Sequence, residues 1–164
     1  MAENHTIKEI IERVKKNKRW PDVKIIQKAY NYALEKHGTQ LRKSGEPYII
    51  HPTNVAYTIA ELGLDEQTIC AALLHDVVED TNVTFDELEK NFSPEVIEGL
   101  KLLTHDKNVD YLEYIRKIKN NPIARKVKLA DLYHNSDPTR MENPTPKDLE
   151  RKEKYRKAIE ILKY

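Results

Sequence analysis

The sequence predicts an all-α fold. Its 164 residues include only four glycines. Apolar residues do not alternate with polar ones as they do in strands, and residues that start or end helices recur along the chain. We expect about six or seven helices. A chain of this length can bury a core without disulfides or structural metals, so the simplest organisation is one compact domain over residues 1–164.

The first helix with recognisable boundaries is expected between Pro21 and Gly38. Proline suits a first helical turn, apolar residues recur along one face, and glycine can end the helix. The following segment, 39–52, contains a Ser-Gly and a Glu-Pro dipeptide that require turn geometry. Pro52 disfavours helical dihedral angles at the preceding residue, so we expect His51 to lie in an ordered loop.

The remaining helices follow from capping residues. Gly63 can close a helix that begins at Thr53, and Asp65 can cap the next, largely apolar helix, which we expect to continue to Asp80. Thr84 has capping-box spacing to the acidic residue three positions later. Further helices are expected at residues 94–103, 110–119, 122–134 and 146–162, the last two separated by a proline-punctuated segment.

Charge and composition argue against several classes of protein. The 28 Lys and Arg residues nearly balance the 27 Asp and Glu residues, so no basic face suggests a nucleic-acid partner. The single cysteine, Cys70, lies in an apolar run, and it is expected to be a buried small side chain in a reducing compartment. No apolar stretch has the length of a signal peptide core or a membrane span. We expect a cytoplasmic protein without a membrane partner.

The most unusual segment is ALLHDVVEDTN, residues 72–82, where an apolar run ends in ionisable side chains. On a continuous helix, residues four apart share a face, so His75 would lie beside Glu79 and Asp76 beside Asp80. Three carboxylates so close together raise one another's proton affinity, and their burial is costly unless a cation compensates. The pattern therefore predicts a bound divalent ion.

A neighbouring His-Asp pair offers one nitrogen and one oxygen ligand, a set suited to manganese, iron, zinc or magnesium. Alone, the pair is a weak signal, and a capped helix end with a surface salt bridge is the alternative. His51 and Asp131 are further candidates, because Asp131 interrupts the apolar face of its expected helix and Asn135 follows four residues later. A structural loop histidine and a satisfied buried carboxylate are the alternatives for these two residues.

Three motifs, RKSGEPYIIHP, AALLHDVVEDT and VKLADLYHN, occur in this order. Together they resemble the HD-domain hydrolases of the stringent response, the (p)ppGpp 3′-pyrophosphohydrolases of the Rel/Spo family and their small stand-alone relatives. The resemblance covers roughly residues 24–160. It implies a compact helical HD-domain fold without the synthetase domain of the long members. It also implies metal-dependent hydrolysis of guanosine tetra- or pentaphosphate to GDP or GTP and pyrophosphate.

The resemblance also implies three groups of site residues. The expected ligands of the metal, typically manganese in this family, are His51, His75, Asp76 and Asp131. The acidic pair that positions and activates the attacking water is Glu79 and Asp80. The residues that meet the base and phosphates of the nucleotide are Arg42, Lys43, Ser44 and Asn135.

One stretch departs from the pattern of the long enzymes. After Asp131 the chain reads LYHNSDPTR, where those enzymes usually carry an arginine directly after the aspartate and a threonine near the position of Pro138. Thr139 and Arg140 could supply compensating contacts. Three alternatives therefore stay open: an HD-fold phosphohydrolase acting on another nucleotide such as NADPH, a non-catalytic alarmone sensor, or a helical interaction domain without a metal.

Overall fold

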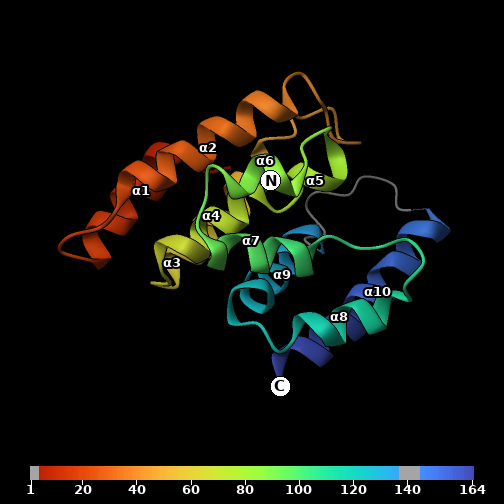
Figure 1. Ribbon diagram of the computed structural model, residues 1–164. Helices are drawn as coiled ribbons and strands as arrows, with labels where there is room; N and C mark the ends of the chain where they lie inside the picture. The colour runs from red at the N-terminus through yellow and green to blue at the C-terminus, as the bar shows by residue number, and fades with distance from the viewer. Residues whose placement is uncertain (1–3, 137–144) are drawn as a thin grey trace.

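In a computed structural model, the described residues, 4–136 and 145–164, form ten helices and no strand, which confirms the all-α class. More helices are present than the six or seven that the sequence led us to expect. In chain order (Figure 1) they are α1 (Ile7–Asn17), α2 (Val23–His37), α3 (Ile50–Glu61), α4 (Glu66–Leu74), α5 (Val77–Asp80), α6 (Phe85–Glu89), α7 (Pro94–Leu103), α8 (Tyr111–Ile118), α9 (Pro122–Asn135) and α10 (Pro146–Lys163).

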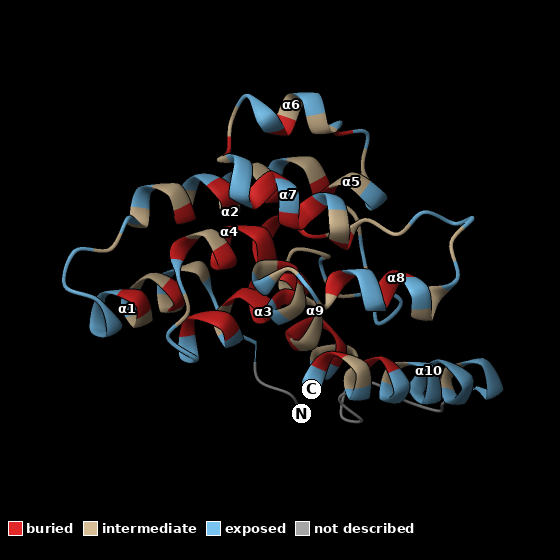
Figure 2. Cartoon of the chain, turned by 60° about the horizontal axis from the view of Figure 1, so that its bottom comes forward, coloured by how far each residue is buried: buried red, intermediate tan, exposed pale blue. Residues whose placement is uncertain are grey.

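The centre of the fold is α4, whose residues are all buried except Gln67, which is half-buried. It packs against α2, α3, α7 and α9, and Figure 2 shows buried residues gathered on these helices, with exposed residues at the periphery. Its apolar sequence, which includes Ile69, Leu73 and Leu74, thus has neighbours on every side. The helix therefore ends deep inside the molecule, and this buried end carries the His-Asp pair.

The C-terminal helices α8, α9 and α10 pack together on one side of α3, α4 and α7. Helix α9 contacts α3 and α4 as well as α7, α8 and α10, whereas α10 packs against α8 and α9 (Figure 1). Ala158 and Leu162 are the buried residues of α10. Helix α9 is therefore the element that brings the last third of the chain to the buried end of α4.

Several capping predictions are confirmed. Asp65 accepts a hydrogen bond from the main-chain N–H of Thr68 at the start of α4, and Thr84 caps α6 in the same manner. Gly38 follows α2 with a φ of 55°, a left-handed conformation that costs glycine little. Among the described residues, no helix has the length and apolar character needed to span a membrane.

The helix α1 was missed by the sequence analysis, which placed the first helix after Pro21. Thr6 and Glu9 form a reciprocal capping box at its start, and Ile10 and Val14 are buried four residues apart. Both features are visible in the sequence, so the failure to predict this helix was an error of interpretation.

Two further expectations about backbone structure were wrong. The helix predicted to run to Asp80 breaks, because α4 ends at Leu74 and a separate short helix, α5, begins after Asp76. His51 was expected in a loop but lies in the first turn of α3. A proline in the first helical turn has no N–H to satisfy, so Pro52 is compatible with the helix despite its usual effect on the preceding residue.

Candidate metal centre

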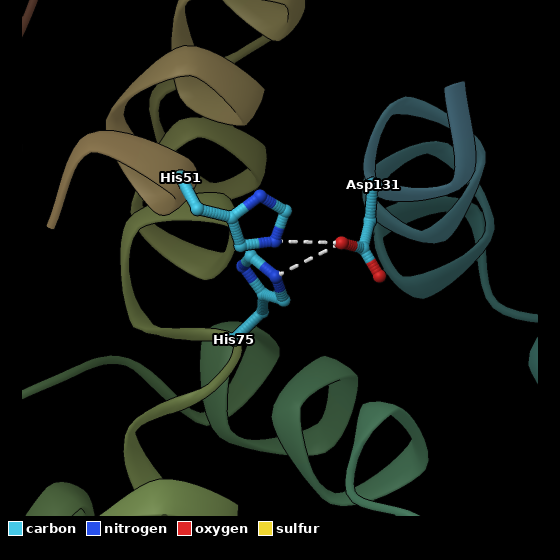
Figure 3. A group of neighbouring side chains, drawn as sticks. All are labelled: His51, His75 and Asp131. Atoms are coloured by element: carbon cyan, nitrogen blue, oxygen red, sulfur yellow. Dashed lines mark ion pairs between the residues drawn. The ribbon is translucent and has the colours of Figure 1, made fainter. Parts of the chain in front are cut away.

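Three buried side chains from three different helical segments meet at the end of α4. His51 comes from α3, His75 follows the last residue of α4, and Asp131 comes from α9 (Figure 3). Oδ1 of Asp131 lies 2.8 Å from Nε2 of His51 and 3.5 Å from Nε2 of His75. One ligand atom from each residue lies within 4.8 Å of the others, so the group could hold a metal ion.

The fourth predicted ligand, Asp76, reaches the same point. Its Oδ2 lies 3.1 Å from Nε2 of His75 and 3.5 Å from Nε2 of His51. The break between α4 and α5 makes this possible, because adjacent residues of a continuous helix would not face each other. The hydroxyl of Tyr48 donates to Asp76 Oδ2 at 2.8 Å and fixes the carboxylate.

The histidine at the end of α4 is arranged as a metal ligand. Nδ1 of His75 donates to the main-chain carbonyl of Ala72, so in the neutral imidazole Nε2 carries the lone pair. This Nε2 is buried and has no hydrogen-bond partner among the described residues, although carboxylates face it. A divalent cation with nitrogen and oxygen ligands satisfies this donor set, so the residues fit a metal.

The pKa values of the cluster indicate the need for positive charge. Burial lowers the pKa of His51 below its usual value. Burial acts in the same direction on His75, but Asp76 and Asp131 outweigh it and raise the pKa well above the usual range. Without a metal, a proton on His75 thus takes over part of the charge compensation that a divalent ion would provide.

The ammonium group of the half-buried Lys128, which the sequence analysis missed, contributes positive charge to the ligand cluster. Nζ of Lys128 lies 3.2 Å from Oδ2 of Asp131, the oxygen that does not face the histidines. Although burial opposes it, the charge of Asp131 raises the pKa of Lys128 well above its usual value. Its spacing of three residues from Asp131 on α9 was a signal in the sequence, because such residues share a helix face.

The acidic pair Glu79 and Asp80 lies on α5, immediately after the ligand-bearing break. The main-chain N–H of His105 donates to Oε1 of Glu79. Both residues are exposed, but partial desolvation of the carboxyl groups raises the pKa of Glu79, and partial desolvation followed by the charge of Asp76 raises that of Asp80. A carboxylate that has a raised pKa and lies near the predicted metal ligands is suited to accept a proton from water.

The four predicted nucleotide contacts are divided between a turn and α9. Arg42 Nη2 donates to Oδ1 of Asn135 at 3.0 Å, and Asn135 Nδ2 donates to Oδ1 of Asp131 at 3.0 Å. Hydrogen bonds therefore link Arg42 and Asn135 to the predicted metal ligand Asp131. Lys43 and Ser44 are exposed in the turn that follows Arg42. Thr139 and Arg140 lie outside the described residues.

Two more polar residues around the cluster were not singled out from the sequence. Tyr48 holds Asp76, as described above, and His134 contacts His51 through their Nδ1 atoms at 2.7 Å. Both belong to the quoted motifs, YIIHP and LADLYHN, but nothing in their spacing told how they would face the ligands. Only the packing of α3 against α9 brings His134 to His51.

Comparison with known proteins agrees with this geometry. Residues 29–134 match the HD domain family. This chain belongs to that family. The resemblance inferred from the three motifs is thereby confirmed for the HD region, which contains all ligands of the candidate centre.

Curated relatives of this HD domain are much longer proteins. The chain is 44% identical over 118 residues to a guanosine-3′,5′-bis(diphosphate) 3′-pyrophosphohydrolase of Aquifex aeolicus, covering 67% of this chain and 17% of the relative. It is 44% identical over 140 residues to a GTP pyrophosphokinase rsh of Brucella ovis, covering 77% of this chain and 18% of the relative. The chain thus spans less than a fifth of the length of these relatives.

A solved structure resembles most of this chain. It was described as a metazoan ortholog of SpoT that hydrolyses ppGpp. The identity is 31% and the TM-score 0.69, with 87% of each chain covered. At this level the likeness extends well beyond the ligand motifs and includes the arrangement of the helices around them.

Proposed function

We propose that this HD domain hydrolyses the 3′-pyrophosphate of guanosine tetra- or pentaphosphate with a bound divalent ion, manganese being the expected metal. The observation that supports the proposal is the grouping of His51, His75 and Asp131, with the fourth predicted ligand, Asp76, within 3.5 Å of both histidines and the acidic pair of α5 following it in the chain. The names of the Aquifex relative and of the metazoan structure support this substrate class.

In the proposed reaction, water attacks the phosphorus next to the ribose 3′ oxygen. The bond between that phosphorus and the 3′ oxygen breaks, and the 3′ oxygen leaves and takes up a proton from water to become the ribose hydroxyl of GDP or GTP. The two phosphoryl groups are released as pyrophosphate, which carries the oxygen of the attacking water. When bound, the divalent ion supplies a Lewis acid that shields phosphate oxygens and acidifies water. Glu79 takes the proton of the attacking water, a role for which its raised pKa is suited. Asp80 orients the same water.

Binding of the nucleotide falls to the turn and the end of α9. Arg42 can grip a phosphate with its planar guanidinium or stack on the base, and Lys43 adds a second positive charge. Ser44 and Asn135 offer a hydroxyl and an amide for further hydrogen bonds. Nη1 of Arg42 is buried without a hydrogen-bond partner among the described residues, so this guanidinium retains a donor for a ligand.

We also infer that residues 1–164 act as one domain in the cytoplasm, with a small nucleotide rather than nucleic acid or a membrane as partner. The continuous core that joins α1 to α10 supports a single domain. The near balance of charges supports the absence of a nucleic-acid face, and the buried free thiol of Cys70 supports a reducing compartment.

Product analysis with ppGpp tests the proposed activity. The purified protein is incubated with manganese, with a chelator, and as the Asp76→Ala variant with manganese. We expect GDP and pyrophosphate only from the wild-type protein with metal. Absence of turnover despite bound manganese would reject this substrate, and parallel assays with NADPH and other nucleotides would then separate another phosphohydrolase from a nucleotide sensor.

A further inference from the structure

Nδ1 of His51, the ring nitrogen that does not face Asp131, belongs to a series of hydrogen bonds that extends away from the candidate metal centre. His51 Nδ1 lies 2.7 Å from His134 Nδ1, and the two imidazole rings stack with centroids 4.8 Å apart. His134 Nε2 in turn lies 3.3 Å from Nδ2 of Asn54, one turn further along α3. Two α3 side chains thus enclose an imidazole from α9.

The orientation of Asn54 is fixed by the segment that precedes α1. Its Oδ1 accepts from the main-chain N–H of His5 at 2.8 Å, and its Nδ2 donates to Oδ1 of Asn4 at 3.0 Å. A main-chain N–H can only donate, so Oδ1 must face His5 and Nδ2 must face His134. Asn54 therefore presents a donor to Nε2 of His134.

The Asn54 donor determines which atoms donate and which accept in the hydrogen bonds between Asn54, His134 and His51. If His134 accepts at Nε2, its neutral imidazole carries the hydrogen on Nδ1 and donates to Nδ1 of His51. His51 then carries its own hydrogen on Nε2, 2.8 Å from Oδ1 of Asp131. Every group is satisfied, but the His51 nitrogen that faces the cluster has no lone pair for a metal.

If His51 binds a metal through Nε2, the hydrogen bond between His51 and His134 must run in the opposite direction. His51 must then donate from Nδ1 to His134 Nδ1, and His134 must carry its hydrogen on Nε2, where it meets the amide donor of Asn54. With this direction, the Nε2 hydrogen of His134 faces the amide hydrogens of Asn54, an unfavourable contact that an acceptor at the position of the amide donor would remove. The amide can offer one only by giving up its contact with His5.

We propose that His134 and Asn54 are positioning residues that determine which nitrogen of His51 is free for the metal, and that Asn54, held by residues 4–5, opposes the metal-binding direction. The proposal rests on the proposed metal centre. It assigns to the segment before α1 an influence on metal affinity, although this segment contributes no ligand. Asn54 is suited to transmit this influence because it contacts both the segment and His134.

Manganese affinity of the full chain, measured by calorimetry without nucleotide, tests the proposal. His134→Phe keeps a flat ring but removes the partner of His51, and we expect about 10–100-fold weaker binding. Asn54→Asp keeps an acceptor for the N–H of His5 and offers a second one to His134 Nε2–H. We expect about tenfold tighter binding in this variant.

The double variant separates this effect from simple attraction between the new carboxylate and the ion. If Asn54 acts through His134, the gain from Asn54→Asp vanishes when His134→Phe is also present. A gain that persists in the double variant, weaker binding in Asn54→Asp alone, or unchanged binding in His134→Phe would each overturn the proposal. Helical circular dichroism on heating verifies that each variant is folded. If the wild-type protein binds no manganese, the metal centre itself is rejected along with this inference.

Discussion

The two sides of the candidate site are built differently. On the metal side, His51, His75 and Asp131 are between 2% and 5% exposed, and they come from three helical segments that pack in the core. On the nucleotide side, Lys43 and Ser44 are exposed in a single turn. The ligand positions are therefore coupled to the stability of the fold, whereas the turn can vary without disturbing it. In the proposed function, the chemistry therefore belongs to the buried side and the choice of substrate to the exposed turn.

The largest effect is expected at Glu79, the proposed proton acceptor. Glu79→Gln removes the proton acceptor but keeps the shape, so the hydrolysis rate should fall by about 10²–10⁴-fold. Manganese affinity should change little, since Glu79 is not among the predicted ligands. Steady-state kinetics and calorimetry check both expectations. A variant that keeps its rate would assign proton transfer to Asp80 instead.

Lys128 tests whether the metal side depends on charge compensation. Lys128→Met leaves Asp131 without its ammonium partner in a buried site, so the free energy of unfolding of the metal-free protein should fall by about 3 kcal/mol. Saturating manganese should restore part of this loss. Urea unfolding measures the effect, and Lys128→Arg serves as the matched control. Equal losses in both variants would indicate packing rather than charge as the cause.

Arg42 tests the independence of the nucleotide side. Arg42→Ala removes a charged hydrogen-bond donor for the substrate, so KM for ppGpp should rise by about 10–100-fold. The melting temperature and manganese affinity should stay near the wild-type values. Arg42→Lys keeps the charge but loses the planar guanidinium, so its KM for ppGpp should lie between those of the wild type and Arg42→Ala. A parallel loss of manganese affinity would show that the link through Asn135 to Asp131 makes the two sides one unit.

The smallest effect is a pH dependence of metal binding. Burial lowers the pKa of His75, but Asp76 and Asp131 raise it well above its usual 6.5 in the metal-free protein. The metal must displace this proton, so affinity should fall by about tenfold for each unit that the pH drops below that raised pKa. Calorimetry in buffers of different ionisation enthalpy measures the released proton. Binding independent of pH from 6 to about 8 would contradict the cause assigned here.

Apart from α1 and Lys128, for which the sequence carried local signals, the failures of the sequence analysis share one physical origin. Capping residues such as Asp65 and Gly38 act locally, and their roles were predicted. The break after Leu74 and the helical position of His51 depend on neighbours distant in the chain, and local preferences gave the wrong answer there. The partners Tyr48 and His134 were missed for the same reason, since each is identified only by what it contacts.

By itself, the sequence determined the all-α class, because helix punctuation and apolar periodicity are local signals. It also determined which residue types are available for a metal, and the three motifs named their positions. Only the tertiary structure decided that His51, His75, Asp76 and Asp131 meet, that Lys128 balances their charge, and that Asn54 and His134 link the segment before α1 to a ligand. Those contacts join residues up to about 80 positions apart, and only the packing of α3, α4 and α9 brings such residues within hydrogen-bond distance.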